Sequence, residues 1–129
     1  MQIQSLTVNI MTDDMEKSLA FYRDLLGFEL VMGVPPEQPP FVWCMLRLDS
    51  VEIMFQTRES MAEEHAAFND MPLGGSQGLY IIVSDVAALA KKIEGTVTLV
   101  KDLHTTFYGH IEISVYDCNH QLLTFAQKP

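Results

Sequence analysis

The nine residues Thr7-Val8-Asn9-Ile10-Met11-Thr12-Asp13-Asp14-Met15 return as a pattern in Gly78-Leu79-Tyr80-Ile81-Ile82-Val83-Ser84-Asp85-Val86. In both stretches, apolar residues occupy every second position, which predicts a strand with one buried face. A polar residue then opens a segment whose apolar residues recur at helical spacing, so each strand is expected to lead into a helix. A pattern that returns in this way indicates a chain built from two similar halves.

The segments that follow these two stretches also correspond. In the first half, Asp13 and Glu16 form a capping signature for a helix that continues to Leu26, and Gly27 allows the left-handed conformation that stops it. The proline-rich residues 34–40 cannot continue a ladder and are expected to form a loop. Each half then ends in a hairpin. The further elements expected are strands at residues 28–32, 41–48 and 51–56 in the first half, and a helix from Ser84 with strands at 96–100, 108–116 and 122–126 in the second.

The sequence therefore predicts an α+β fold in which two βαβββ modules form a single domain over residues 1–129. Module 1 covers about residues 1–57, a connector about residues 58–76, and module 2 about residues 77–129. Within the connector, Glu59 to Asn69 is expected to form a surface helix. Neither module can cover its own sheet, so the two modules are expected to pack together.

The composition narrows the class of partner. The net charge of −9 argues against nucleic acid, which needs clustered Lys and Arg, and it is compatible with a cationic ligand, although solubility is the plainer explanation. No apolar run approaches the roughly 18 residues of a membrane span, and the N-terminus lacks the features of a secretory signal. Cys44 and Cys118 have neither metal-ligand spacing nor a disulfide framework. We therefore expect a cytoplasmic protein that binds neither nucleic acid nor membrane.

On these patterns the chain resembles the vicinal oxygen chelate superfamily, which includes glyoxalase I, extradiol dioxygenases, fosfomycin-resistance proteins and bleomycin-resistance proteins. The resemblance covers essentially the whole chain. Its closing part is a degraded form of the family's Asp-Pro-Asp-Gly-Asn-Leu-Leu-Glu-Phe turn and strand. The stretches that carry it are Val8-Asn9-Ile10, then Asp14-Met15-Glu16-Lys17-Ser18-Leu19-Ala20-Phe21-Tyr22 with Leu26-Gly27-Phe28, and finally Asp117-Cys118-Asn119-His120-Gln121-Leu122-Leu123-Thr124-Phe125.

The resemblance implies a curled mixed sheet around a shared cavity, with four metal ligands on its wall. In the metal enzymes each half supplies two ligands, and the corresponding positions here are Thr7, Glu52, Gly78 and Thr124. Only Glu52 retains a metal-binding side chain, whereas a divalent ion normally takes three or more protein ligands. We therefore expect no metal, no other cofactor, and no metal-dependent isomerase or dioxygenase chemistry at the usual positions.

Strand alternation predicts which side chains face the cavity. If Glu52 faces inward, Met54 and Gln56 share its face, and pairing across the hairpin adds Arg47, Met45 and Trp43. The mixture of aromatic, methionine and polar groups suits a small organic ligand. The predicted ligand pocket comprises Thr7, Asn9, Trp43, Met45, Arg47, Glu52, Met54, Tyr80, His110, Glu112, Ser114 and Thr124.

Each of these residues also has a simpler interpretation. Arg47 lies across the strand pair from Glu52, and the two can neutralise each other, since buried charges are normally paired. Trp43 can be core packing, and the methionines can be adaptable filler. The sharpest alternative is that His110 and Glu112, two residues apart on one strand, form a displaced metal or acid–base site with Glu52.

Three functions remain open on the sequence. The first is a metal-free protein that binds or sequesters a small cationic or aromatic molecule, as the bleomycin-resistance branch of the family does. The second is a glyoxalase-like lyase or isomerase, or a dioxygenase-related enzyme, with Glu52 as a candidate catalytic base or with an unusual site at Glu52, His110 and Glu112. The third is an interaction module whose interface is its function. The resemblance also implies a homodimer, with the modules paired within one chain or exchanged between two.

Overall fold

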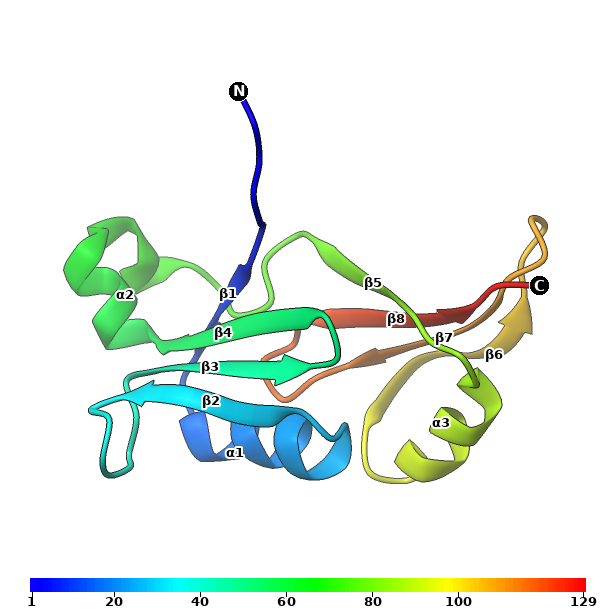
Figure 1. Cartoon of the computed structure of the whole chain (residues 1–129), viewed down its shortest axis with the longest axis horizontal. Coiled ribbons are helices and arrows are strands. Elements are labelled where there is room, and N and C mark those ends of the chain that lie inside the picture. The colour runs from blue at the N-terminus through cyan, green and yellow to red at the C-terminus, as the bar shows by residue number, and fades with distance from the viewer. The chain divides into compact units, whose positions relative to one another are not determined.

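The computed structural model describes all 129 residues, and the chain forms two compact units, Met1–Leu73 and Gly74–Pro129. Each unit contains a four-stranded sheet with a helix packed on one of its faces (Figure 1). The division between the units falls inside the predicted connector at residues 58–76. No helix in the chain is both long and apolar enough to cross a membrane.

The first unit has the strand order β1-β4-β3-β2, with β1 parallel to β4 and the other neighbours antiparallel. The helix α1 continues without interruption as a π-helical segment at Ala20–Leu25. After the sheet comes α2, followed by a short 3₁₀ helix at Ala66–Asp70. The elements are β1 (Val8–Thr12), α1 (Met15–Leu19), β2 (Glu29–Val34), β3 (Trp43–Leu48), β4 (Val51–Thr57) and α2 (Arg58–Glu64).

The second unit repeats this arrangement, with the strand order β5-β8-β7-β6 and β5 parallel to β8. Its elements are β5 (Gly78–Ile82), α3 (Val86–Ile93), β6 (Thr98–Thr105), β7 (Ile111–Tyr116) and β8 (Leu122–Gln127). Two βαβββ modules of mixed sheet and helix are therefore present, and the α+β fold class expected from the sequence is confirmed.

One face of each sheet is buried because alternate strand residues are apolar. In the first unit the ring of Phe55 on β4 is fully buried and lies 4.8 Å from the ring of Tyr22, which follows α1. Cys44 on β3 donates to the sulfur of Met15 on α1 at 3.6 Å. Burial of side chains of this size stabilises the fold by about 1.5–3 kcal/mol each. In the second unit the corresponding buried residues are Val86, Ile93, Ile113, Val115, Leu123 and Phe125.

Both helices begin one residue later than the sequence predicts. The side chain of Asp14, rather than Asp13, caps α1 by accepting from the amide of Lys17 at 3.1 Å. Likewise Asp85, rather than Ser84, caps α3 by accepting from the amide of Ala88 at 3.0 Å. Asp14 and Asp85 have the non-helical backbone conformation of an N-cap, whereas their predecessors lie outside the helices.

The strand limits also differ from the expected ones. Pairing of β1 begins at Val8 with Ile53, so residues 4–7 lie outside the ladder and Leu6 is 94% exposed. β6 runs to Thr105, and β7 begins only at Ile111, because the chain turns between them. In that turn the amide of Gly109 donates to the carbonyl of Thr106 at 3.0 Å, with Gly109 at a φ of 89°.

The connector helix is shorter than expected. α2 ends at Glu64, and His65 has an extended backbone that separates it from the 3₁₀ helix at Ala66–Asp70. The guanidinium of Arg58 fixes this segment, because it binds Asp13 through two hydrogen bonds of 2.9 and 3.2 Å and donates to the carbonyl of Met71 at 2.6 Å.

Candidate functional site

The candidate residues of the first unit lie on the sheet face opposite the buried one. Register sets this arrangement, because Met45 pairs with Met54 and Arg47 with Glu52, while the alternate pairs Cys44–Phe55 and Leu46–Ile53 are buried. Thr7 immediately precedes β1. Residues of the predicted pocket on this face are Asn9, Trp43, Met45, Arg47, Glu52 and Met54.

Arg47 and Glu52 form an ion pair. Two guanidinium nitrogens of Arg47, Nη2 at 2.7 Å and Nε at 3.2 Å, donate to the same oxygen, Oε2 of Glu52. The side chains are 50% and 37% exposed, so the pair lies at the edge of the face rather than in a dry interior. The mutual neutralisation expected from the cross-strand placement is therefore present, and it disfavours a role for Glu52 as a free base.

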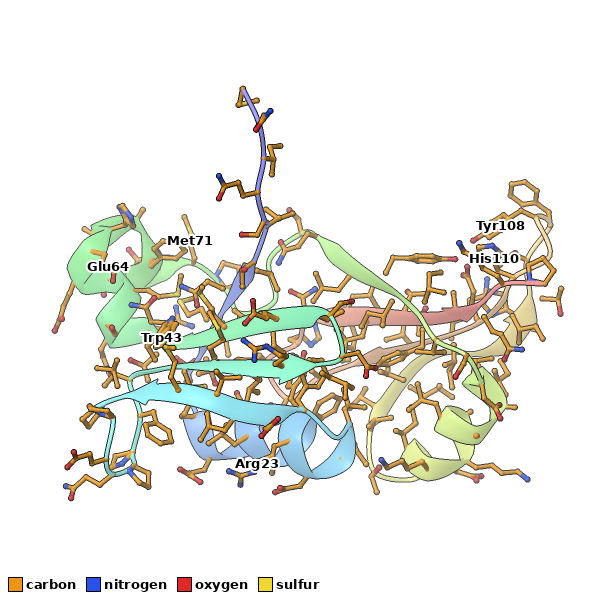
Figure 2. All side chains as sticks on the ribbon, in the orientation of Figure 1. Arg23, Trp43, Glu64, Met71, Tyr108 and His110 are labelled. Carbon is orange, nitrogen blue, oxygen red and sulfur yellow. The ribbon has the colours of Figure 1, made fainter.

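An amide network lies on the same face. Asn9 donates from Nδ2 to Oε1 of Gln56 at 2.8 Å, and Nε2 of Gln56 donates to Ser60 at 2.9 Å and to Glu64 at 3.1 Å. Trp43 pairs with Gln56 across β3 and β4, and Figure 2 labels both Trp43 and Glu64 in this unit. No sequence pattern marks Ser60 and Glu64 as part of this face, because α2 brings them to the sheet only in three dimensions.

The candidate residues of the second unit share the face of the sheet that α3 does not cover. Tyr80 pairs with Thr124, and Thr124 pairs in turn with Ser114. The hydroxyl groups of Ser114 and Thr124 are 2.8 Å apart and hydrogen-bonded. Glu112, two residues before Ser114 on β7, has the same orientation.

Three side chains surround the carboxylate of Glu112, a residue that is only 7% exposed. The hydroxyl of Tyr108 donates to Oε2 of Glu112 at 2.6 Å, and the hydroxyl of Tyr80 donates to the same oxygen. The Nδ1 atom of His110 lies 2.8 Å from the hydroxyl of Tyr80 and 4.0 Å from Oε2 of Glu112. Figure 2 shows Tyr108 and His110 together at the end of this sheet. We call Tyr80, Tyr108, His110 and Glu112 the Glu112 cluster.

The hydrogen bonds of the Glu112 cluster show which ring nitrogen of His110 carries a proton. Tyr80 has one hydroxyl proton and donates it to Glu112, so its oxygen must accept from Nδ1–H of His110. This leaves Nε2 of His110 for another partner. His110 itself lies in the turn before β7, one residue outside the strand in which the sequence placed it.

Hydrogen bonding in the Glu112 cluster favours the ionised form of Glu112 and the neutral form of Tyr80. The hydrogen bond from Tyr108, followed by that from Tyr80, holds the pKa of Glu112 below its ordinary value despite burial, which acts in the opposite direction. The same hydrogen bond to Glu112, with burial, raises the pKa of Tyr80 well above its usual range. At neutral pH the cluster therefore holds a fixed negative charge.

The residues at the metal positions implied by the resemblance do not fit a divalent ion. Gly78 has no side chain, Thr7 and Thr124 have only hydroxyls, and Glu52 is bound to Arg47. No group of three or more His, Cys, Asp or Glu side chains is arranged to hold a metal. The alternative site at Glu52, His110 and Glu112 draws on both units, and the Oε2 atom of Glu112 is already bonded to two phenols.

The pairing of β1 with β4 and of β5 with β8 shows which residues of the two units are equivalent, and it differs from the equivalence that the resemblance implies. Val8 pairs with Ile53 in the first unit, and its counterpart Leu79 pairs with Leu123 in the second. The counterpart of Thr124 is therefore Met54, and that of Glu52 is Leu122. Glu52 and Thr124, which the resemblance assigns to equivalent ligand positions, are thus two residues out of register with each other.

A groove of about 330 Å³ lies on the other side of the second unit, between α3 and β6. Leu99, Leu103 and Ile113 are among its lining residues, and none of the predicted pocket residues takes part. Its charged members, Lys91, Glu94 and Asp102, form no ion pair with one another. The groove therefore lacks the convergent polar groups that the Glu112 cluster provides.

The sequence profile of the Glyoxalase/Bleomycin resistance protein/Dioxygenase superfamily matches residues 4–125. Among curated proteins, none matches the chain.

Solved structures share the fold at low identity. A glyoxalase/bleomycin resistance protein/dioxygenase family enzyme from Burkholderia phytofirmans PsJN is 22% identical, with a TM-score of 0.78 over 95% of this chain and 97% of that one. A superfamily member from Sphaerobacter thermophilus is 20% identical, with a TM-score of 0.78 over 98% of each chain. TioX from Micromonospora sp. ML1 is 17% identical, with a TM-score of 0.72 over 96% of this chain and 98% of that one.

Proposed function

Because the chain belongs to the Glyoxalase/Bleomycin resistance protein/Dioxygenase superfamily, we propose that it is a metal-free member that binds and sequesters a small cationic or aromatic organic molecule. The observation that carries the proposal is the replacement of metal ligands by a different kind of site. Gly78, Thr7 and Thr124 stand at the family's ligand positions, whereas the open sheet face of the second unit carries a carboxylate among aromatic rings.

Electrostatics support a cation as the ligand. The protein has 17 acidic residues against 8 Lys and Arg, so its field attracts cations. Within that field Arg47 neutralises Glu52, while Glu112 has no Lys or Arg in an ion pair with it. An aromatic ligand also has partners, because Trp43 and Tyr80 lie on the open faces.

The second candidate is an enzyme that uses Glu112 and His110 for acid–base chemistry, as a glyoxalase-like lyase or isomerase or a dioxygenase-related protein. The specific observation in its favour is the continuous chain from Nδ1 of His110 through the hydroxyl of Tyr80 to Oε2 of Glu112. Such a chain can carry a proton between a histidine and a carboxylate. Glu52 is held by Arg47 and belongs to no such chain.

We propose further that the protein acts as a cytoplasmic homodimer. Its two cysteines form no disulfide, as is usual for a protein of a reducing compartment. Strand residues such as Met32, Val34 and Leu99 are about half exposed in the single chain, and a partner subunit can cover such residues.

The deciding experiment is native mass spectrometry of untagged protein purified without chelator, with elemental analysis of the same sample and a thermal-shift screen. The screen pairs basic aromatic compounds with neutral analogues of the same shape. A metal-free protein whose melting temperature rises with basic compounds and not with their analogues supports a binding role. A stoichiometric metal, or the absence of a shift for every basic compound, overturns it. Turnover of a dicarbonyl–thiol adduct or a catechol without added metal selects the enzyme instead.

A further inference from the structure

The buried carboxylate of Glu112 differs from every other acidic group that the candidate site contains. It is 7% exposed, yet no Lys or Arg forms an ion pair with it. The basic groups beside it are His110, at 4.0 Å, and His104, which pairs with Glu112 across β6 and β7, and a histidine is charged only when protonated. Buried charges in proteins are normally paired. Glu52, by contrast, has Arg47 at 2.7 Å. The second unit therefore holds a negative charge without a permanent counter-ion.

Phenol hydroxyls leave one oxygen of this carboxylate accessible. Tyr108 and Tyr80 both donate to Oε2, whereas Oε1 makes no hydrogen bond. Since no side-chain oxygen without a hydrogen bond is buried, Oε1 must reach the surface. The charge is thus held in place by the phenols, and Oε1 keeps some contact with solvent.

Aromatic rings form a continuous series that includes the two tyrosines bonded to this carboxylate. Tyr108 contacts the ring of His110 edge-on at 4.9 Å, and His110 stacks on Tyr80 at 6.4 Å with 28° between the planes. Phe107 contacts Tyr108 edge-on at 4.9 Å and is itself fully exposed. A fully exposed phenylalanine beside two half-exposed tyrosines is an apolar surface with no structural use within the unit.

The aromatic rings and the negative charge of Glu112 together indicate which class of ligand the site can bind. Oε2 already accepts from two phenols, which leaves Oε1 as the one carboxylate oxygen free to accept, so the site offers negative charge and π faces but few hydrogen-bond acceptors. A hydrated metal ion or a primary ammonium needs such acceptors, whereas an alkylated ammonium needs only charge and aromatic faces. The weakly hydrated cation is also the one that loses least on leaving water.

We propose that Glu112, Tyr80, Tyr108 and Phe107 form a binding site for the alkylated ammonium group of a small organic cation. His110 is a positioning residue, because its Nδ1–H donates to Tyr80 and fixes the phenol that borders the carboxylate. The inference rests on the proposed function and deepens it, since it names the group that the ligand presents and the residues that receive it.

The test compares choline with its uncharged isostere 3,3-dimethylbutan-1-ol, titrated into the full-length protein and followed by amide chemical shifts. Choline is expected to bind at least about tenfold more tightly than the alcohol, with shifts at Tyr80 and Glu112. Equal affinity for the two compounds, or shifts confined to other parts of the chain, overturns the assignment.

Substitutions separate the local charge from the overall field. Glu112→Gln keeps the shape of the side chain and is expected to weaken choline binding about tenfold, while Glu63→Gln, which removes the same charge from the exposed surface of α2, leaves it unchanged. Equal losses in both variants show a general field effect and refute the site.

A second variant, Phe107→Ala, tests the aromatic part of the site without straining the fold. Phe107→Ala removes a ring that is fully exposed and contacts only Tyr108, so folding is unaffected even if Glu112→Gln proves unstable. We expect about threefold weaker choline binding in Phe107→Ala, and unchanged binding contradicts the aromatic part of the site. Absence of any choline binding overturns this inference alone if basic aromatic compounds still raise the melting temperature. Failure of both overturns the proposed function as well.

Discussion

At the scale of single residues, the carboxylate of Glu112 depends on two tyrosines for its charge. The hydrogen bond from Tyr108 is the largest contribution that holds its pKa below the ordinary value, and Tyr80 adds to it. Because the pKa of Glu112 is lower in the folded than in the unfolded protein, its charge stabilises the fold above the unfolded pKa of about 4.3. That contribution is lost as the pH falls through the folded pKa.

Tyr108→Phe removes one of these donors and should therefore destabilise the protein in a pH-dependent way. We expect the free energy of unfolding to fall by about 1 kcal/mol at pH 7, a low value for a hydrogen bond to a charged group because Tyr108 is half exposed. The loss should shrink as the pH falls below the unfolded pKa of about 4.3 and through the lower folded pKa of Glu112. Urea unfolding at pH 7 and pH 3 measures it. Tyr116→Phe is the control, because the hydroxyl of Tyr116 makes no hydrogen bond, and an equal loss at both pH values contradicts the argument.

The two cysteines should differ sharply in reactivity. Burial raises the pKa of the Cys44 thiol to about 11, so almost no thiolate forms at pH 8, and the side chain is also fully buried. Cys118 is exposed in the turn before β8. A chromogenic thiol reagent at pH 8 should modify one thiol per chain in native protein and two in urea. Cys118→Ser should abolish the native reaction, and reaction of that variant before unfolding would show that Cys44 is accessible.

At the scale of elements, the turn between β6 and β7 positions half of the Glu112 cluster. Tyr108 and His110 flank Gly109, whose φ of 89° lies in the left-handed region. An added methyl group meets only Pro129 at 3.6 Å, so the backbone conformation, not the space, restricts this position.

Gly109→Ala should therefore strain the turn, lower the free energy of unfolding by about 1 kcal/mol, and displace Tyr108 from Glu112. The matched control is Gly78→Ala, because Gly78 lies in β5 without a positive φ and its added methyl meets Leu122 at an ordinary 3.6 Å. Thermal unfolding and tyrosine chemical shifts measure the two effects. Comparable losses in both variants would mean that the turn conformation is not the cause.

Arg58 links the connector to the start of α1. Its guanidinium reaches Asp13 and the carbonyl oxygens of Phe68, Asn69 and Met71 simultaneously, which the single ammonium of lysine cannot do. Arg58→Lys should therefore speed amide hydrogen exchange in residues 66–71 and leave β3 and β4 protected. Arg23→Lys serves as the control, since Arg23 is exposed and pairs only with its neighbour Asp24. Unchanged exchange in the connector would exclude Arg58 as its anchor.

At the scale of the whole molecule, the proposed homodimer makes a simple prediction about mass. Exposed apolar residues on β2 and β6 leave surface that a second copy can bury. Native mass spectrometry and light scattering at micromolar concentration should give twice the mass of one chain, with dissociation on dilution. A monomer at every concentration would contradict the proposal and leave the binding site of the second unit to act alone.

Much of the fold could be predicted because it follows from periodicity. The alternation of Val8 and Ile10 with their neighbours, and the stop at Gly27, are local patterns that determine strand and helix directly. Element limits were less predictable. Asp13 has the capping spacing to Glu16, but in the structure it is Asp14 that accepts from the amide of Lys17.

The candidate site also has a part that could be predicted from the sequence and a part that could not. Alternation correctly placed Arg47 across from Glu52, and Glu112 on the face of Ser114 and Thr124, because strand side chains follow a period of two. Tyr108 was not among the predicted pocket residues, although alternation in the strand expected at 108–116 places it on the face of His110 and Glu112. It reaches Glu112 only because Gly109 turns the chain before β7.

The sequence by itself determined the two βαβββ modules, the acidic charge, and which side chains stand at the metal positions that the resemblance implies, because each depends on residue type at a position. Only the tertiary structure decided which acidic residue is neutralised and which is not. Both Glu52 and Glu112 lie on open sheet faces, but the register of β3 and β4 brings Arg47 to one, and the β6–β7 turn brings two phenols to the other. Charge pairing depends on distances of a few ångströms between strands, which residue order alone does not specify.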